Sequence, residues 1–249
     1  MSFVNRSGSQ AAGATLRVSA LVPAGGRGVR MGGDRPKQFL AIGGVPLMVH
    51  SLRTLQAAPS VEEIILAVPS SERNYCEREI VARYGLTKVS RVVAGGAERQ
   101  DSVGAALAAV AIPADVVLVH DAVRPFLTVD MIERVCTEAA RVGGAIIAIP
   151  ARDTLKEVGE GAVIQRTVDR RPLWQAQTPQ AFQRAVLERA HERARAEAYL
   201  GTDEADLVQR LGVPVVVVEG SGENIKVTRP EDLVIGEAIW ASRCKTGVP

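Results

Sequence analysis

The chain has 249 residues, which is enough for one α/β domain with a sizeable hydrophobic core. Its formal net charge of +2 gives no bulk attraction to nucleic acid or anionic membranes. Its aromatic content of 4% is too low to indicate side-chain platforms for stacking nucleic-acid bases. Cys76, Cys136 and Cys244 are widely spaced and form no C-x-x-C pair, so we expect reduced thiols in a cytoplasmic protein rather than a disulfide framework or a zinc site.

The first segment, residues 1–17, is rich in Ser, Gly and Ala and lacks the apolar stretch of a secretory signal. We predict a disordered leader there and a single domain over residues 18–249. The longest apolar runs, such as 215–218, have the length of strands, so no membrane-spanning segment is expected.

Strands and helices alternate along the rest of the chain. Continuous apolar runs predict buried strands over residues 18–22, 64–68, 116–119, 145–149 and 215–218. The segments between them predict helices over residues 47–58, 102–110, 131–141, 180–198 and 203–211. Thr128 precedes the third of these helices, and Thr202 is the expected cap of the last. This order predicts a doubly wound, mostly parallel, Rossmann-like α/β sheet.

A glycine-rich loop follows the first predicted strand. Gly25, Gly26 and Gly28 let the backbone turn tightly and approach a ligand with no side chain in between. Just beyond the turn lie three cations, Arg30, Arg35 and Lys37. Because backbone N–H dipoles and converging cations are what a polyphosphate needs, the loop predicts a polyphosphate site. The alternative is an ordinary strand-to-helix turn with solvated arginines.

Two common phosphate-binding motifs do not fit this loop. A dinucleotide fingerprint starting at Gly26 would need a third glycine where the chain has Met31. A Walker loop would need G-K-[ST], which does not occur. The loop instead resembles the nucleotidyltransferase signature P-A-x-G-x-G-x-R-M followed by P-K, at residues 23–31 and 36–37.

Polar residues also follow other predicted strands, where open parallel sheets bind their ligands. The turn at residues 95–102 offers backbone groups at Gly96 and Ala97, with Ser102 nearby, to read a base edge. Asp121 directly follows the strand at 116–119, and one carboxylate together with phosphate oxygens and waters suits Mg²⁺. The structural alternatives are a plain helix N-terminus for the turn and an ion pair at a strand end for Asp121.

Two more cations belong to this set of strand-end residues. Arg124 presents a planar fork for a phosphate, and Lys226 is predicted to lie in a short strand after a glycine-rich turn. The alternatives are a partner of Asp121 for Arg124 and a surface lysine for Lys226.

One segment, residues 152–177, departs from the alternation of strand and helix. It is polar, alternates in hydropathy over 162–169 and has a turn at 159–161, which predicts a protruding β-hairpin. An isolated two-stranded hairpin is only marginally stable in water, so we expect this arm to pack against a second subunit.

Together the motifs identify a resemblance to the 2-C-methyl-D-erythritol 4-phosphate cytidylyltransferases of isoprenoid synthesis, over residues 18–240. They are the loop at 23–38, G-G-x-E-R-x-D-S-V at 95–103, V-H-D-A-x-R-P at 119–125, R-D-T at 152–154, T-V-D-R at 167–170, L-W-x-A-Q-T-P-Q at 173–180, T-D-E-A at 202–205 and N-I-K-V-T-R-P-E-D-L at 224–233. One departure is Gly25, where the family usually has alanine.

The resemblance implies roles on the nucleotide side of the site. Arg30 and Lys37 would grip the triphosphate of CTP, and Asp121 would hold Mg²⁺. Cytosine and ribose would be surrounded by Gly96, Ala97 and Ser102. Further substrate-binding positions implied by the resemblance are Pro23, Ala24, Gly25, Gly26, Gly28 and Ala122.

On the acceptor side, the resemblance gives Lys226 and Arg170 the task of positioning the attacking phosphate, with Arg124 and Thr154 helping to bind it. In this family the arm that carries Thr154 and Arg170 crosses to the neighbouring subunit, so a homodimer with arm exchange is implied.

The implied reaction is attack of a polyol phosphate on the α-phosphorus of CTP, which releases pyrophosphate and needs no general base. The nearest alternative is a ribitol-5-phosphate cytidylyltransferase. A hexose-1-phosphate nucleotidyltransferase is disfavoured because its Arg-to-Pro-Lys spacing is longer. A regulatory nucleotide-binding domain would not need Lys37, Asp121 and Lys226 together.

Overall fold

The computed structural model describes residues 16–26 and 36–246. Gly28, Arg30 and Arg35 of the glycine-rich loop and residues 1–15 of the predicted leader therefore lie outside the described residues. The last two residues of that leader contact the domain: Leu16 packs against the core, and the backbone N–H of Arg17 donates to Asp115 Oδ2 at 3.1 Å.

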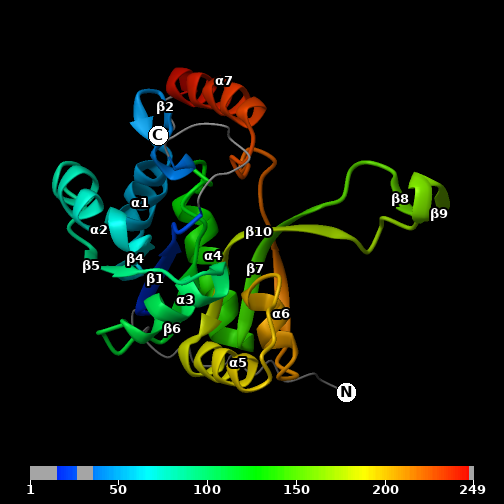
Figure 1. The fold of residues 1–249 in the computed structure, drawn as a ribbon, viewed down its shortest axis with the longest axis horizontal. Coiled ribbons are helices and arrows are strands. Elements are labelled where there is room, and N and C mark those ends of the chain that lie inside the picture. The colour runs from blue at the N-terminus through cyan, green and yellow to red at the C-terminus, as the bar shows by residue number, and fades with distance from the viewer. Residues whose placement is uncertain (1–15, 27–35, 247–249) are drawn as a thin grey trace, which may run out of the picture.

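A seven-stranded sheet forms the centre of the molecule, in the order β11-β7-β10-β6-β1-β4-β5 (Figure 1). Its strands are β1 (Val18–Pro23), β4 (Val61–Val68), β5 (Val89–Ala94), β6 (Val116–Val119), β7 (Gly144–Pro150), β10 (Trp174–Gln183) and β11 (Val215–Glu219). Four of its six strand pairings are parallel, and β10 runs antiparallel to both of its neighbours, β6 and β7. The predicted mostly parallel α/β sheet is therefore confirmed.

Helices cover both faces of the sheet (Figure 1). The described helices are α1 (Leu47–Ala57), α2 (Arg73–Tyr75) with a π-helical continuation Cys76–Ala82, α3 (Arg99–Ala108), α4 (Val129–Val142), α5 (Arg184–Ala196), α6 (Glu204–Gln209) and α7 (Pro230–Thr246). One core cluster lies between the sheet and α1, α4 and the α2 region, and a second between the sheet and α3, α5 and α6. Because helices cover both faces, the central strand β6 is apolar along its whole length, and its neighbour β1 is apolar except for Ser19.

A third, smaller core lies under α7. It joins Ile42 and Leu47 to Phe126 and Val227, with Trp240 of the helix packed against it. The short strands β2 (Ala41–Ile42) and β3 (Val45–Pro46) and the 3₁₀ turn Lys37–Phe39 lead into this cluster. The cluster thus supports both the segment after Lys37 and the segment around Lys226.

Several predictions of individual elements are wrong. Residues 180–183, predicted to begin a helix, form the end of β10, and α5 begins only at Arg184. The cap of α6 is Asp203 rather than Thr202, since the Asp203 side chain accepts from the Asp206 N–H. Lys226 lies in a loop and not in a strand. Thr128, which precedes the third predicted helix, is the cap of α4 and accepts from Met131 N–H at 3.2 Å.

The predicted hairpin within 152–177 is confirmed. Strands β8 (Leu155–Val158) and β9 (Ile164–Val168) pair antiparallel and extend away from the sheet, to the right in Figure 1. Val158, Val163 and Ile164 are more than half exposed on this arm. Its role in dimerisation stays a prediction.

Two further expectations concern membranes and thiols. Within the described part of the chain, the helices are too short or too polar to cross a lipid bilayer. The three cysteines are free: Cys76 and Cys136 are buried and Cys244 is exposed.

Candidate active site

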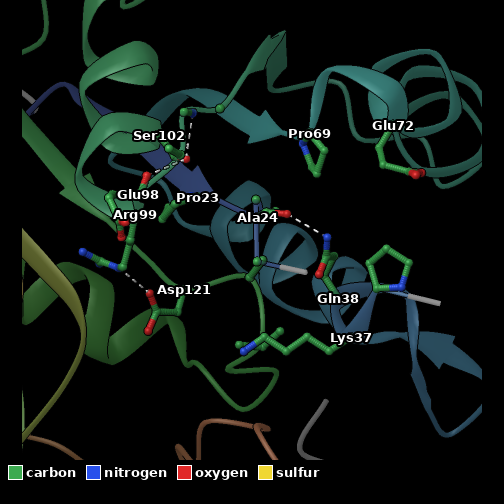
Figure 2. Close-up of a pocket in the computed structure, with 18 of the residues that line it drawn as sticks. Pro23, Ala24, Lys37, Gln38, Pro69, Glu72, Glu98, Arg99, Ser102 and Asp121 are labelled. Carbon is green, nitrogen blue, oxygen red and sulfur yellow. Dashed lines mark hydrogen bonds and ion pairs between the residues drawn. The ribbon is translucent and has the colours of Figure 1, made fainter. Parts of the chain in front are cut away.

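A cavity of about 750 Å³ opens where the parallel strands β1, β4, β5 and β6 end. Pro23, Pro69, Gly95 and Asp121 lie at or just beyond the carboxyl ends of these four strands, and all four line it. Figure 2 labels Pro23, Pro69 and Asp121 around the cavity. This is the edge where an open parallel sheet binds ligands. The sequence placed the glycine-rich loop, the 95–102 turn, Asp121 and Lys226 at this edge, and the described members of that set line one cavity.

Backbone and side-chain hydrogen bonds fix the described part of the glycine-rich loop. Ala24 N–H donates to Ala67 O at 2.7 Å, and Gln38 Nε2 donates to Ala24 O at 2.7 Å (Figure 2). A Cβ added at Gly25 would lie 3.3 Å from Ser102 Oγ, and one added at Gly26 would lie 3.6 Å from Lys37 Cε. The loop therefore passes close to α3 on one side, and Lys37 lies beside Gly26 on the cavity wall.

The opposite wall is the turn that opens α3. Gly96 N–H donates to Ser102 Oγ at 3.2 Å, and Ser102 in turn donates to Glu98 O. A Cβ on Gly95 would lie 2.7 Å from Ser102 Oγ, which explains why a glycine stands there. Backbone groups at Gly96 and Ala97 thus face the cavity in a fixed geometry, as a base-reading edge requires.

Asp121 lies at the centre of a cluster of charges. Its Oδ1 accepts from Arg99 Nε at 3.1 Å and its Oδ2 lies 2.8 Å from Lys226 Nζ. Arg124 Nε is 3.7 Å from Oδ2. Asp121 and Lys226, both placed by the sequence at this edge of the sheet, are in direct contact, although 105 residues separate them in the chain.

These cations set the protonation state of Asp121. Burial alone would raise the pKa of its carboxyl, but the positive charges of Arg99, Lys226 and Arg124 outweigh burial and hold the pKa well below its usual range. The carboxylate is therefore ionised at every physiological pH and serves as an oxygen ligand or charge partner, not as an acid.

His120, the residue before Asp121, is fully buried and belongs to a hydrogen-bond relay beneath the site. Asp121 N–H donates to Thr178 Oγ1 at 3.0 Å, Thr178 Oγ1 lies 3.1 Å from His120 Nδ1, and His120 Nε2 lies 3.2 Å from Arg124 O. Burial lowers the pKa of His120 to about 4. A neutral ring that accepts from Thr178 and donates to the Arg124 carbonyl satisfies every group in the relay.

The donor set fits Mg²⁺ only in one way. Among the described residues, no group of three or more His, Cys, Asp or Glu side chains is placed to hold a metal. Mg²⁺ commonly takes one or two carboxylates and completes its shell with water and substrate phosphate. Asp121, ionised and facing the cavity, can supply that carboxylate if Lys226 yields its place on Oδ2.

Three predicted binding residues do not line the cavity of this chain. Arg124 is buried and its Nη1 donates to Asn224 O at 2.8 Å, so it supports the wall behind Asp121. Thr154 and Arg170 lie exposed on the arm, and Arg170 donates to the Arg152 carbonyl. The remaining predicted positions, Gly28 and Arg30, fall outside the described residues.

Sequence reasoning assigned no role to Arg99 and Glu204, although both lie in quoted motifs. Arg99 lines the cavity and is paired with both Asp121 and Glu204. Gln38, which donates to the Ala24 carbonyl, likewise belongs to a quoted motif, P-K-Q, in which no role was predicted for it. Arginine and glutamate inside two separate motifs were the available signal, but nothing in their spacing shows that they meet.

The chain is similar to known proteins over most of its length. A family model described as IspD, 2-C-methyl-D-erythritol 4-phosphate cytidylyltransferase, matches residues 18–242. A relative from Syntrophus aciditrophicus with the same name is 49% identical over 89% of this chain and 95% of its own, and one from Geotalea uraniireducens is 46% identical over 91% and 98%.

Solved structures give the same answer. A 2-C-methyl-D-erythritol 4-phosphate cytidylyltransferase from Thermus thermophilus has a TM-score of 0.75 and 37% identity, covering 90% of this chain and 98% of that one. A 4-diphosphocytidyl-2C-methyl-D-erythritol synthase from Anaerococcus prevotii has a TM-score of 0.79 at 26% identity, covering 92% and 100%. With the family model spanning nearly the whole described domain, the chain belongs to the 2-C-methyl-D-erythritol 4-phosphate cytidylyltransferase family.

Proposed function

We propose that this chain is a CTP-dependent cytidylyltransferase that converts 2-C-methyl-D-erythritol 4-phosphate to 4-diphosphocytidyl-2-C-methyl-D-erythritol, with release of pyrophosphate. Family membership supports the substrate assignment. The observation that carries the chemistry is one cavity that joins glycine-lined backbone to Lys37, Lys226 and Asp121. The relatives from Syntrophus aciditrophicus and Geotalea uraniireducens carry the erythritol-phosphate name, so a ribitol-phosphate enzyme is not favoured.

The reaction is an in-line displacement at the α-phosphorus of CTP. An oxygen of the acceptor phosphate attacks, the bond to the β-phosphate oxygen breaks, and pyrophosphate leaves with its electron pair. Because the nucleophile is already an anion, no side chain has to remove a proton. Catalysis then consists of positioning and of stabilising negative charge.

The cations divide this work by their place in the cavity. Lys37 lies beside Gly26, where the triphosphate of CTP would meet the backbone of the loop, and the sequence adds Arg30 to the same loop. Lys226 lines the cavity beside Asp121 and is partly exposed, so it can turn to the phosphate of the acceptor. The two lysines would thus hold the leaving and the attacking groups.

Magnesium is part of the proposal. Asp121 would hold the ion, which when bound would neutralise phosphate charge and polarise the phosphorus–oxygen bonds. Arg99 keeps the Asp121 carboxylate ionised and oriented, whichever cation occupies the cavity.

The 95–97 turn gives a reason for the choice of cytosine. Its backbone groups are fixed by Ser102 and by the Gly95 N–H bond to Val68 O at 2.7 Å. A rigid backbone edge that pairs an exocyclic amine leaves its own groups unpaired with uracil. Such a mismatch lowers kcat/KM for the nucleotide with the wrong base by up to roughly 10⁴-fold.

We also propose a homodimer in which the arms are exchanged. Thr154 and Arg170, which the family resemblance places at the acceptor phosphate, lie on a hairpin that extends away from its own sheet (Figure 1). The exposed apolar side chains Val158, Val163 and Ile164 on that hairpin suit contact with a second copy. Free, unpaired cysteines agree with a cytoplasmic location.

The experiment that tests the function is a pyrophosphate-release assay with Mg²⁺ and 2-C-methyl-D-erythritol 4-phosphate, run separately with CTP, UTP, ATP and GTP. We expect release with CTP to exceed release with UTP by a factor of at least about a hundred. Equal use of CTP and UTP would contradict the proposed reading of the base.

A further inference from the structure

Arg99, on the cavity wall, and Glu204 form a bridge between two helices. Arg99 is the first residue of α3 and Glu204 the first residue of α6. Arg99 Nη1 donates to both carboxylate oxygens of Glu204, at 2.9 and 2.7 Å, while its Nε donates to Asp121 Oδ1 at 3.1 Å. One guanidinium therefore holds two carboxylates at once.

Glu204 is the fixed end of this bridge. Its side chain is 1% exposed, against 29% for Arg99. The start of α6 is tied to β10, because Gln180 Nε2 donates to Asp203 Oδ2 at 2.8 Å and Ala205 N–H donates to Gln180 Oε1. Glu204 therefore cannot follow a moving partner, and it fixes Arg99 instead.

The bridge decides which oxygen of Asp121 faces the cavity. Arg99 Nε donates to Oδ1, while Oδ2 lies 2.8 Å from the Nζ of Lys226, whose side chain is 38% exposed. Lys226 is the partner that can leave, so Oδ2 is the oxygen that becomes available when substrates enter.

Glu204 also changes the charge that Asp121 experiences. Arg99, Arg124 and Lys226 surround Asp121, so three cations face two carboxylates once Glu204 is counted, and the net charge is +1. Without Glu204 the net charge would be +2, which repels a divalent cation more strongly in a partly buried site. A buried ion pair is by itself weak evidence of a contribution to stability, and this one ends on Asp121 at the cavity.

We propose that Glu204 and Arg99 are positioning residues whose task is to present Asp121 Oδ2 to a divalent cation and to cancel the charge of Arg99 at that point. The proposal rests on the proposed function, since the cation is the one that accompanies CTP. It gives a task to two motif residues that touch neither reacting atom.

The test is calorimetric titration of CTP into the full-length protein without acceptor, once with Mg²⁺ and once with EDTA. The ratio of the two dissociation constants is the gain in CTP affinity due to Mg²⁺. We expect Glu204→Gln, which keeps the shape but removes the charge, to reduce this gain at least about fivefold. CTP affinity in EDTA should not weaken, because the variant site is more positive.

The matched control is Glu197→Gln. Glu197, directly after α5, pairs with both Arg193 and Arg210 at 2.7 Å, so the change removes equally short ion pairs away from the cavity. This variant should keep the wild-type gain from Mg²⁺. An unchanged gain in Glu204→Gln, or equal weakening of CTP with and without Mg²⁺, would overturn the proposal.

Two further outcomes are informative. If Glu204→Gln does not fold, Arg99→Lys carries the test, because it keeps the charge but its ammonium cannot bridge both carboxylates. A wild-type gain in that variant also overturns the proposal. Absence of CTP binding by the wild-type protein would instead overturn the proposed function, so the two failures are distinguishable.

Discussion

Asp121 shows what sequence reasoning can and cannot predict for a single residue. Its place after an apolar strand predicted a carboxylate at the ligand edge of the sheet, and it lies there, 2.8 Å from Lys226. The direction of Arg124, three residues later, was not predictable. Its guanidinium turns inward to the Asn224 carbonyl because the chain folds back over it, a contact that spans 100 residues.

Lys37 provides the first prediction. Lys37→Ala should lower the rate of pyrophosphate release by roughly a hundredfold or more, because it removes a fixed positive charge from the triphosphate side of the cavity. Steady-state release with CTP measures the effect. Lys245→Ala, at an exposed position in the last turn of α7, is the control and should keep the wild-type rate. Near-normal turnover of Lys37→Ala would remove the proposed mechanism.

His120 gives a prediction for pH. Its pKa is lowered to about 4 in the folded protein, so below pH of roughly 6.5 the unfolded chain binds a proton that the folded chain does not. The contribution of His120 to the free energy of unfolding is therefore fully present above that pH. It falls as the pH drops towards 4, by up to about 3 kcal/mol in total.

Urea unfolding of wild type and His120→Gln at pH 7 and pH 5 measures this contribution. The variant should lose less stability between the two pH values than the wild type, whatever its stability at pH 7. Equal losses in both proteins would show that His120 does not titrate as its burial requires.

At the scale of elements, apolar strands were predictable and polar ones were not. The runs at 18–22 and 116–119 are buried by helices on both faces, so their sequence is apolar apart from Ser19. Strand β10, in contrast, is mostly polar over residues 174–180, and its Gln177, Thr178 and Gln180 are buried because they bond to neighbouring loops. Hydropathy gives no signal for such a strand.

The cap of α4 gives a prediction at this scale. Thr128→Ala should lower the free energy of unfolding by about 1 kcal/mol, since the Met131 N–H loses its acceptor. Thr137→Ala is the matched control: Thr137 lies within the same helix and bonds only to the preceding turn, at Glu133 O. Thermal or urea unfolding compares the two, and an equal effect would contradict the capping role.

At the scale of the whole molecule, a single chain gives no reason for the exposed apolar side chains on the arm of residues 152–177. Its alternating hydropathy predicted the hairpin because that signal is local. Its partner could not be predicted from local pattern, and Val158, Val163 and Ile164 stay more than half exposed on the hairpin of the single chain.

Mixing of inactive variants tests arm exchange. Lys37→Ala and Arg170→Ala, mixed in equal amounts with subunit exchange, should recover about a quarter of the wild-type rate, because half of the dimers would hold one whole site. Lys37→Ala mixed with Lys226→Ala is the control and should stay inactive, since both residues line the cavity of the same chain. Recovery in neither mixture, despite proven exchange, would mean that each arm serves its own subunit.

The acceptor phosphate distinguishes the proposed enzyme from a ribitol-5-phosphate cytidylyltransferase, so the two acceptors should be compared in one assay. We would determine kcat/KM with saturating CTP and Mg²⁺ for 2-C-methyl-D-erythritol 4-phosphate and for ribitol 5-phosphate. The account predicts a preference for the erythritol phosphate of at least about tenfold, which corresponds to about 1.4 kcal/mol in transition-state stabilisation. A preference for ribitol 5-phosphate would contradict it.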